Sequence, residues 1–127
     1  MAVPGDEFTF PRTGATLRNR AVLAAMTNKQ SNPDGTLSDA EINWLLRRAE
    51  GGFGIVTTAA SHVTPGGQGW VGEMGVWGDH QMPGLTRLAE GIRERGALSL
   101  GQIFHGGMRA PEDLTGEQPV SASENPC

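Results

Sequence analysis

The sequence predicts an α/β fold with a parallel sheet, on the strength of two observations. Short apolar runs alternate along the 127 residues with amphipathic helical segments, in the order strand, helix, strand, helix, strand. The apolar runs are continuous instead of alternating with polar residues, which is typical of parallel strands covered on both faces. Because such connections are right-handed, we expect the strands to lie side by side and to point the same way.

Three apolar runs are expected to be the strands of this sheet. They span residues 21–26 (AVLAAM), 53–59 (FGIVTTA) and 97–104 (ALSLGQIF). The β-branched residues of the second run and its flanking glycines favour a strand over a helix. A hairpin of residues 7–10 and 15–17, around the turn-like PRTG, is expected to precede them.

The first helix is predicted over residues 39–50. Ser38 and Glu41 form an S-x-x-E capping box, in which the two side chains satisfy two free amides of the first turn. Gly51 and Gly52 supply a left-handed end. One face of the helix collects the apolar residues Ile42, Leu45, Leu46 and Ala49 at helical spacing.

A second helix is predicted between Asp79, placed to cap it, and Gly96, placed to end it. Its apolar face consists of Leu85, Leu88, Ala89 and Ile92. A glycine-rich loop leads from the second strand to Trp77, and the tail beyond Phe104 lacks a periodic apolar segment. Both of these stretches are expected to be loop.

Composition and charge exclude several classes of function. The 10 basic and 14 acidic residues give a net charge of −4, and the scattered basic residues argue against a nucleic-acid partner. The chain has no apolar stretch of the roughly 18 residues that cross a bilayer and no signal-peptide pattern at its start, so a cytoplasmic location is expected without a membrane partner. The single cysteine, Cys127, excludes an intrachain disulfide and a cysteine-based metal site.

The three histidines do not form a recognisable metal motif, so no metal site is expected. His62 and His105 follow the second and third strands and are expected to line loops. His80 is expected to lie exposed in the first turn of the second helix.

Three strands leave this sheet open. A parallel sheet of three strands has unpaired edges, and two helices are too few to cover both of its faces. A closed α/β barrel needs eight strands and about 250 residues. The 127 residues are therefore expected to be the first part of a larger fold, or a subunit that another chain completes.

Five strings in order and in spacing point to one family. They are LRNRAVLAAMTNKQS, GGFGIVTTAASHVTPGGQG, MGVWGDHQMPGLTRLAEGIRERG, LGQIFHGGMR and PVSAS. Together they resemble the first three strand units of the Old Yellow Enzyme family, the FMN-dependent NAD(P)H:flavin oxidoreductases and ene-reductases. The resemblance implies that residues 1–127 are the N-terminal part of a TIM (β/α)8 barrel, with a hairpin at 7–20 and the strand units at 21–127.

The resemblance also implies which residues contact FMN. Ala25, Met26 and Thr27 match the segment that the family lays along the flavin, with a hydroxyl near the flavin C4 oxygen. Ala60 matches a small residue against the flavin edge, and Gln102 matches a glutamine that binds the pyrimidine side of the ring. A glutamine amide suits that edge because it donates and accepts at once. All these positions lie at carboxyl ends of expected strands, where barrel active sites form.

Two arginines of the family signature have a different expected role. Arg18 and Arg20 precede the first strand, at the bottom of the barrel, where structural ion pairs are expected.

The expected function is hydride transfer from NAD(P)H through FMN to an activated, electrophilic alkene or another small acceptor. The family places its substrate-binding pair and its proton-donating tyrosine on and after the fourth strand, so no catalytic residue is expected within these 127 residues. One alternative is a non-catalytic truncated half-barrel, or a subunit that forms a homo-oligomer or needs a complementary chain. Another is a small flavodoxin-like binding domain, although such folds usually have five parallel strands.

Overall fold

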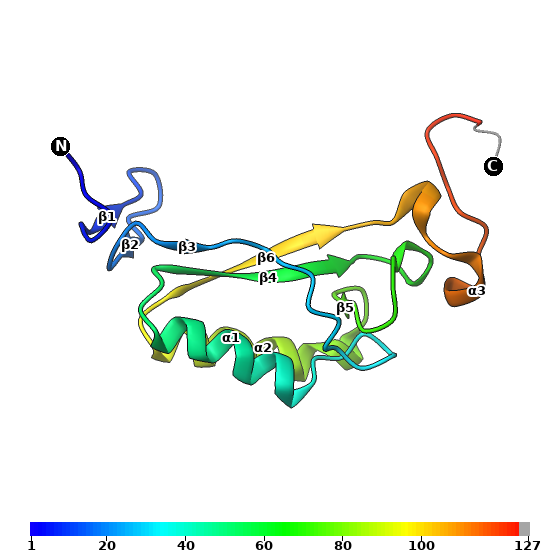
Figure 1. Cartoon of the computed structure of the whole chain (residues 1–127), viewed down its shortest axis with the longest axis horizontal. Helices are drawn as coiled ribbons and strands as arrows, with labels where there is room; N and C mark the ends of the chain where they lie inside the picture. The colour runs from blue at the N-terminus through cyan, green and yellow to red at the C-terminus, as the bar shows by residue number, and fades with distance from the viewer. Residues whose placement is uncertain (125–127) are drawn as a thin grey trace.

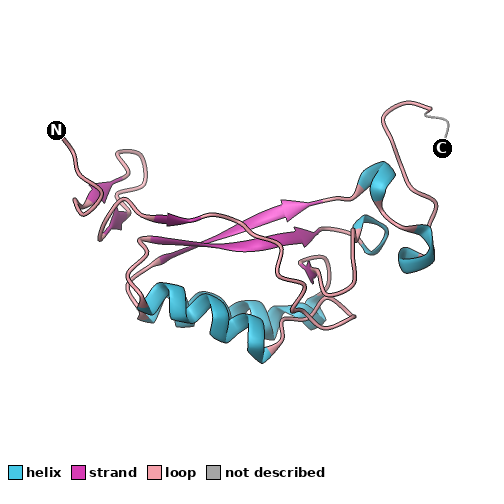
Figure 2. Ribbon diagram, viewed as in Figure 1, coloured by secondary structure: helices cyan, strands magenta, loops and turns pink. Residues whose placement is uncertain are grey.

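The computed structural model describes residues 1–124 and shows one parallel sheet with two long helices on one of its faces (Figures 1 and 2). The sheet consists of β3 (Val22–Leu23), β4 (Ile55–His62), β5 (Met74–Gly75) and β6 (Leu98–Phe104). The predicted α/β class and the parallel direction of the strands are confirmed. Cys127 lies outside the described residues.

β4 is the centre of the sheet. β6 pairs with it from Ile55 to His62, with an irregularity in the ladder between Thr57 and Ala60. On the opposite edge, β3 pairs with the first two residues of β4 and β5 with the last two. The expected strand 21–26 is shorter than predicted, because only Val22 and Leu23 pair with β4.

The predicted hairpin is present as a separate antiparallel ribbon. It consists of β1 (Phe8–Thr9) and β2 (Thr16–Leu17). Four short elements in stretches expected to be loop were missed. The glycine-rich segment contains β5 and a 3-10 turn at Pro65–Gly67, and the tail contains a 3-10 turn at Gly107–Arg109 and the short helix α3 (Glu112–Thr115). All four are so short that they carry no periodic pattern.

Helix α1 (Asp39–Glu50) has the predicted bounds. Ser38 caps it by accepting a hydrogen bond from the Glu41 N–H at 3.1 Å. The second half of the expected capping box is wrong, because the Glu41 carboxylate bonds to other side chains. Gly52, with a φ of 107°, supplies the left-handed end.

Helix α2 (Met82–Glu94) follows a single 3-10 turn at Asp79–Gln81. Asp79 therefore lies inside that turn and does not cap α2, contrary to expectation. Gly96 ends the segment in the left-handed region, with a φ of 71°.

The core lies between the helices and one face of the sheet. Side chains from α1 and α2 pack there against Leu23 of β3 and Val56 of β4. The buried apolar residues of the two helices are Ile42, Leu45, Ala49, Leu88 and Ile92. Leu46, expected on the same face, is only partly buried against this core, and Ala89 is exposed.

The opposite face of the sheet is open. Val56 faces the helices and pairs with Ser99, so the neighbouring Leu98 and Leu100 lie on the other face. They are 38% and 52% exposed. The strand at 97–104 is confirmed, but the described residues do not cover both of its faces.

Arg18 connects the carboxyl-terminal ends of α1 and α2. Its guanidinium donates to the backbone oxygens of Arg95 (2.9 Å), Phe53 (2.8 Å) and Ala49. Arg20 lies over the ring of Phe8, at 5.1 Å from its centroid. Neither arginine is in an ion pair in the described part of the chain. The expected ion pairs are wrong for the described residues, because backbone carbonyl groups contact Arg18 and an aromatic ring contacts Arg20.

Candidate functional site

Ala60 and Gln102 lie directly opposite one another in the parallel ladder of β4 and β6. The pairing follows the irregularity in β4, where the Gln102 N–H donates to the Thr58 hydroxyl at 3.2 Å. Bulges of this kind change the direction of the following side chains and are frequent beside active sites. The structure thus brings together two of the residues that the sequence predicts to be in the site.

The two partners differ in exposure. Ala60 is 7% exposed, whereas the Gln102 side chain lies on the surface of the described chain. Its amide donor and acceptor groups are accessible to a bound molecule.

The segment Ala25, Met26 and Thr27 continues from β3 toward the same end of the sheet (Figure 1). It is not part of a ladder in the described chain. Ala25 is half-buried, while Met26 is 48% exposed and Thr27 is exposed. A backbone without strand partners and an exposed hydroxyl suit contact with a polar ring.

The loop after this segment is anchored to α1 by a buried carboxylate. Glu41 is fully buried and accepts a hydrogen bond from the Asn28 amide at 2.9 Å and another from the Ser31 hydroxyl. Asn28 also accepts one from the Gln30 N–H at 3.1 Å. The sequence pattern placed Glu41 only in the helix cap, because a capping pattern does not reveal contacts with distant loops.

A second buried polar pair lies at the end of β4. His62, which was expected to line a loop, is the last residue of the strand and is 2% exposed. The His62 Nδ1 lies 3.9 Å from the Oε2 of Glu73. Glu73 is 1% exposed, and its Oε2 accepts a hydrogen bond from the Gly69 N–H at 2.6 Å. Burial lowers the pKa of His62 and raises the pKa of Glu73, so both side chains are favoured in their neutral forms.

His105 lies in a loop as expected, whereas His80 is exposed as expected but lies before α2 and not in its first turn. His105 follows β6, is exposed, and accepts a hydrogen bond from the Gly107 N–H at 2.9 Å through Nδ1. His80 is exposed in the turn that precedes α2. In residues 1–124 there is no group of three or more potential metal-binding side chains.

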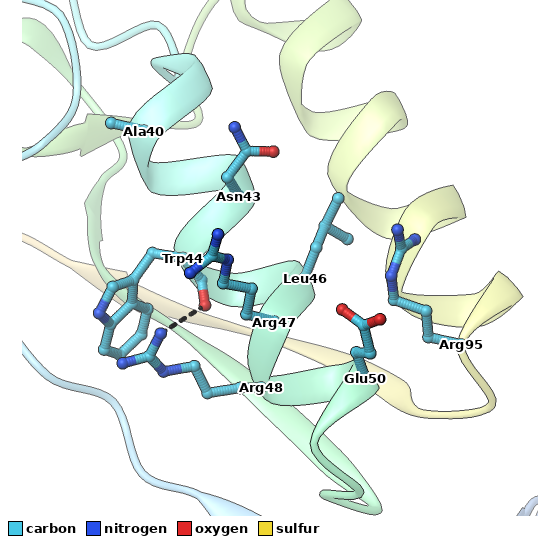
Figure 3. Close-up of a pocket in the computed structure, with 8 residues that line it drawn as sticks. All are labelled: Ala40, Asn43, Trp44, Leu46, Arg47, Arg48, Glu50 and Arg95. Atoms are coloured by element: carbon cyan, nitrogen blue, oxygen red, sulfur yellow. Dashed lines mark hydrogen bonds between the residues drawn. The ribbon is translucent and has the colours of Figure 1, made fainter.

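A groove of about 490 Å³ lies on the outer side of the helices (Figure 3). It carries Arg47, Arg48 and Arg95, and the Arg48 guanidinium stacks 3.7 Å from the centroid of the Trp44 ring. Basic side chains in the last turn of a helix are favoured by the helix dipole. None of the residues predicted to bind FMN lines this groove.

A family model described as the NADH:flavin oxidoreductase / NADH oxidase family matches residues 11–127. The chain belongs to this family. The resemblance to Old Yellow Enzyme expected from the five strings is confirmed, and FMN and NAD(P)H, as expected, are the cofactors of this family of flavin oxidoreductases.

Relatives in the NADH:flavin oxidoreductase family are similar over nearly the whole chain. A probable NADH-dependent flavin oxidoreductase, YqiG, of Bacillus subtilis is 40% identical over 91% of this chain and 30% of its own length. An NADH:acrylate oxidoreductase of Vibrio harveyi is 37% identical over 97% of this chain and 12% of its own. The chain thus spans less than a third of these curated relatives.

A solved structure supports the fold. The Old Yellow Enzyme homologue from Zymomonas mobilis has a TM-score of 0.86 and 26% identity, over 99% of this chain and 35% of that one. The expected N-terminal part of a TIM barrel is confirmed. Among residues 1–124, the helices are too short or too polar to span a membrane.

Proposed function

We propose that this chain supplies part of the flavin site of an FMN-dependent NAD(P)H oxidoreductase. The observation that carries the proposal is the in-register pair of Ala60 and Gln102 at the carboxyl end of the sheet. That end is where the barrels of this fold build their active sites. We further propose that residues 1–127 are one incomplete barrel domain, with the hairpin at 7–20 and the strand units at 21–127.

The side chains at this end fit the edge of a flavin ring. Ala60 leaves room for the ring because its side chain is a single methyl group. Gln102 presents an exposed amide that donates to a ring oxygen and accepts from a ring N–H. Ala25, Met26 and Thr27 offer backbone groups and one hydroxyl at the end of the neighbouring strand.

The Thr27 hydroxyl has a defined electrostatic role in this proposal. A hydrogen bond to the flavin C4 oxygen stabilises negative charge on the reduced ring and raises its reduction potential. Bound FMN supplies hydride transfer, from NAD(P)H to an activated alkene or another small acceptor. No residue of this chain is assigned to the acceptor.

A second candidate is a half-barrel that binds a complementary chain or a second copy and has no activity alone. The open face of the sheet favours it, because Leu98 and Leu100 lie exposed there. An uncovered apolar strand is a template for association.

The test uses the protein purified from its source, with any further polypeptide it carries. Three proteins are compared: the wild type, Gln102→Leu, and the control Ser99→Ala on the same strand. For each we measure the intact mass, the flavin absorbance, and the oxidation of NADH and of NADPH. The proposal predicts a yellow wild type and a yellow control, and flavin binding weakened at least about tenfold in Gln102→Leu. A wild type that binds no FMN overturns it. A colourless chain with a mass of 13.4 kDa supports the second candidate.

A further inference from the structure

We propose that Glu41 is a positioning residue that holds the cofactor-facing segment at residues 25–27 through its hydrogen bonds to Asn28 and Ser31. The inference rests on the proposed function, and extends it to a residue on the helix behind the sheet. Glu41 itself is not placed in contact with the cofactor.

The contacts of Glu41 join two elements that are distant along the chain. Its Oε1 accepts from the Asn28 Nδ2 at 2.9 Å, and its Oε2 accepts from the Ser31 hydroxyl. Asn28 directly follows Thr27, so its side chain ties the end of the cofactor-facing segment to the first turn of α1.

A helix cap does not explain this arrangement. Ser38 already bonds the Glu41 N–H, and the Glu41 carboxylate takes no part in the cap. A fully buried carboxylate is costly unless hydrogen bonds satisfy both oxygens. Here both oxygens have donors from the loop, so loss of the carboxylate frees the loop rather than the helix.

The loop conformation needs such an anchor. Lys29, between Asn28 and Ser31, has a φ of 54°, a left-handed conformation that residues other than glycine seldom adopt. Such strained residues persist only where surrounding contacts hold them, and they concentrate at functional sites. The Glu41 bonds hold both sides of Lys29, and the Asn28 Oδ1 adds a bond to the Gln30 N–H.

The experiment compares Glu41→Gln and Asn28→Ala with Glu50→Gln, a control at the exposed end of the same helix. Each variant of the purified protein is characterised by its FMN affinity and by the reduction potential of bound flavin. Hydrogen exchange of residues 25–31 and the free energy of unfolding are measured as well. Thr27→Ala is combined with Glu41→Gln in a double-mutant cycle.

The expected result is an FMN affinity weakened at least about tenfold, as for other residues that orient a ligand-binding group. A shifted potential and faster exchange of residues 25–31 should accompany it in both Glu41→Gln and Asn28→Ala, but not in Glu50→Gln. The effects of Glu41→Gln and Thr27→Ala on the potential should be non-additive, since one acts through the other. Asn28→Ala keeps the bond from Ser31, so it tests the proposal even if Glu41→Gln does not fold.

Two other results would overturn the positioning role of Glu41 or the proposed function, and they can be told apart. In the first, Glu41→Gln and Asn28→Ala keep the wild-type FMN affinity and flavin reduction potential and lose only free energy of unfolding. This result overturns the positioning role and leaves the proposed function intact. A wild type that binds no FMN overturns the proposed function, and the inference with it.

Discussion

Gly72 packs directly against the backbone of Lys29: a Cβ built on Gly72 would lie 2.6 Å from the Lys29 carbonyl oxygen. The Gly72 carbonyl accepts a hydrogen bond from the Ser31 N–H at 3.1 Å. The loop after β3 is thereby held on one side by α1, through Glu41, and on the other by the segment before β5. The two contacts fix the path of the chain beside the proposed flavin site.

Replacement of Gly72 by alanine should destabilise the protein more than replacement of Gly52. Both glycines have a positive φ, of 81° and 107°, which costs an alanine about 1 to 2 kcal/mol. A Cβ at Gly52 meets nothing within 4 Å, whereas at Gly72 it meets the Lys29 backbone. Urea unfolding of Gly72→Ala and Gly52→Ala measures the difference. Equal losses would show that the contact with Lys29 carries no energy.

Arg18→Met should lower the free energy of unfolding by about 3 kcal/mol, because it leaves three backbone carbonyl groups without their charged donor. Arg20→Met is the control: it removes only a contact with the ring of Phe8, worth less than about 1 kcal/mol at an exposed site. Urea denaturation at neutral pH measures the free energy of unfolding of the two variants, and shows which substitution costs more. A smaller loss in Arg18→Met than in Arg20→Met would contradict the bridging role of Arg18.

The buried pair of His62 and Glu73 should give stability two opposite dependences on pH. Burial raises the pKa of Glu73 above its ordinary 4.5, so the folded protein binds more protons than the unfolded one above pH 4.5, and stability falls as pH rises through that window. Burial lowers the pKa of His62 below its ordinary 6.5, so stability is lost as pH falls below 6.5.

Glu73→Gln separates the two effects, because it keeps an acceptor for the Gly69 N–H and removes the titration. Its stability relative to the wild type should increase as pH rises from 4.5, and then level off above the raised pKa of Glu73. Unfolding free energies at a series of pH values between 4 and 8 check this. A constant difference between the two proteins across that range would show that Glu73 titrates normally.

The chain expressed by itself should self-associate through β6. Only β4 pairs with this strand in the described chain, and Ile103 is 76% exposed. Ile103→Lys places a charge on the strand and should shift the population toward monomer, since charges on open strands oppose edge pairing. Val120→Lys, at an exposed apolar residue in the tail, should leave association unchanged. Sedimentation velocity over a range of concentrations measures it, and a wild type of 13.4 kDa throughout would refute the prediction.

The structure bears on the placement of the five residues predicted to contact FMN, and not on the contacts themselves. The register of β4 and β6 places Ala60 opposite Gln102, which the order of strands alone does not specify. Ala25, Met26 and Thr27 do lie beyond β3, toward the same end of the sheet. Their contact with flavin stays a prediction, which the FMN affinities of the variants address.

The sequence by itself determined the features that depend on neighbours along the chain. Helix α1 begins and ends where a capping serine, an apolar period and a glycine pair place it. The parallel direction of the strands was predicted from the succession of apolar runs and helices. The family was predicted from five short strings in the same order. Each of these signals lies within a few residues, so it survives in the linear sequence.

Only the tertiary structure decided what depends on contacts between distant segments. Three features arise where loops meet the end of the sheet. They are the buried Glu41 with its bond from Asn28, the buried pair of His62 and Glu73, and the short strand β5. Whether a polar side chain is buried depends on which distant segments cover it. A short-range pattern carries no record of those segments, and this is why the anchor behind the proposed flavin site became visible only in the fold.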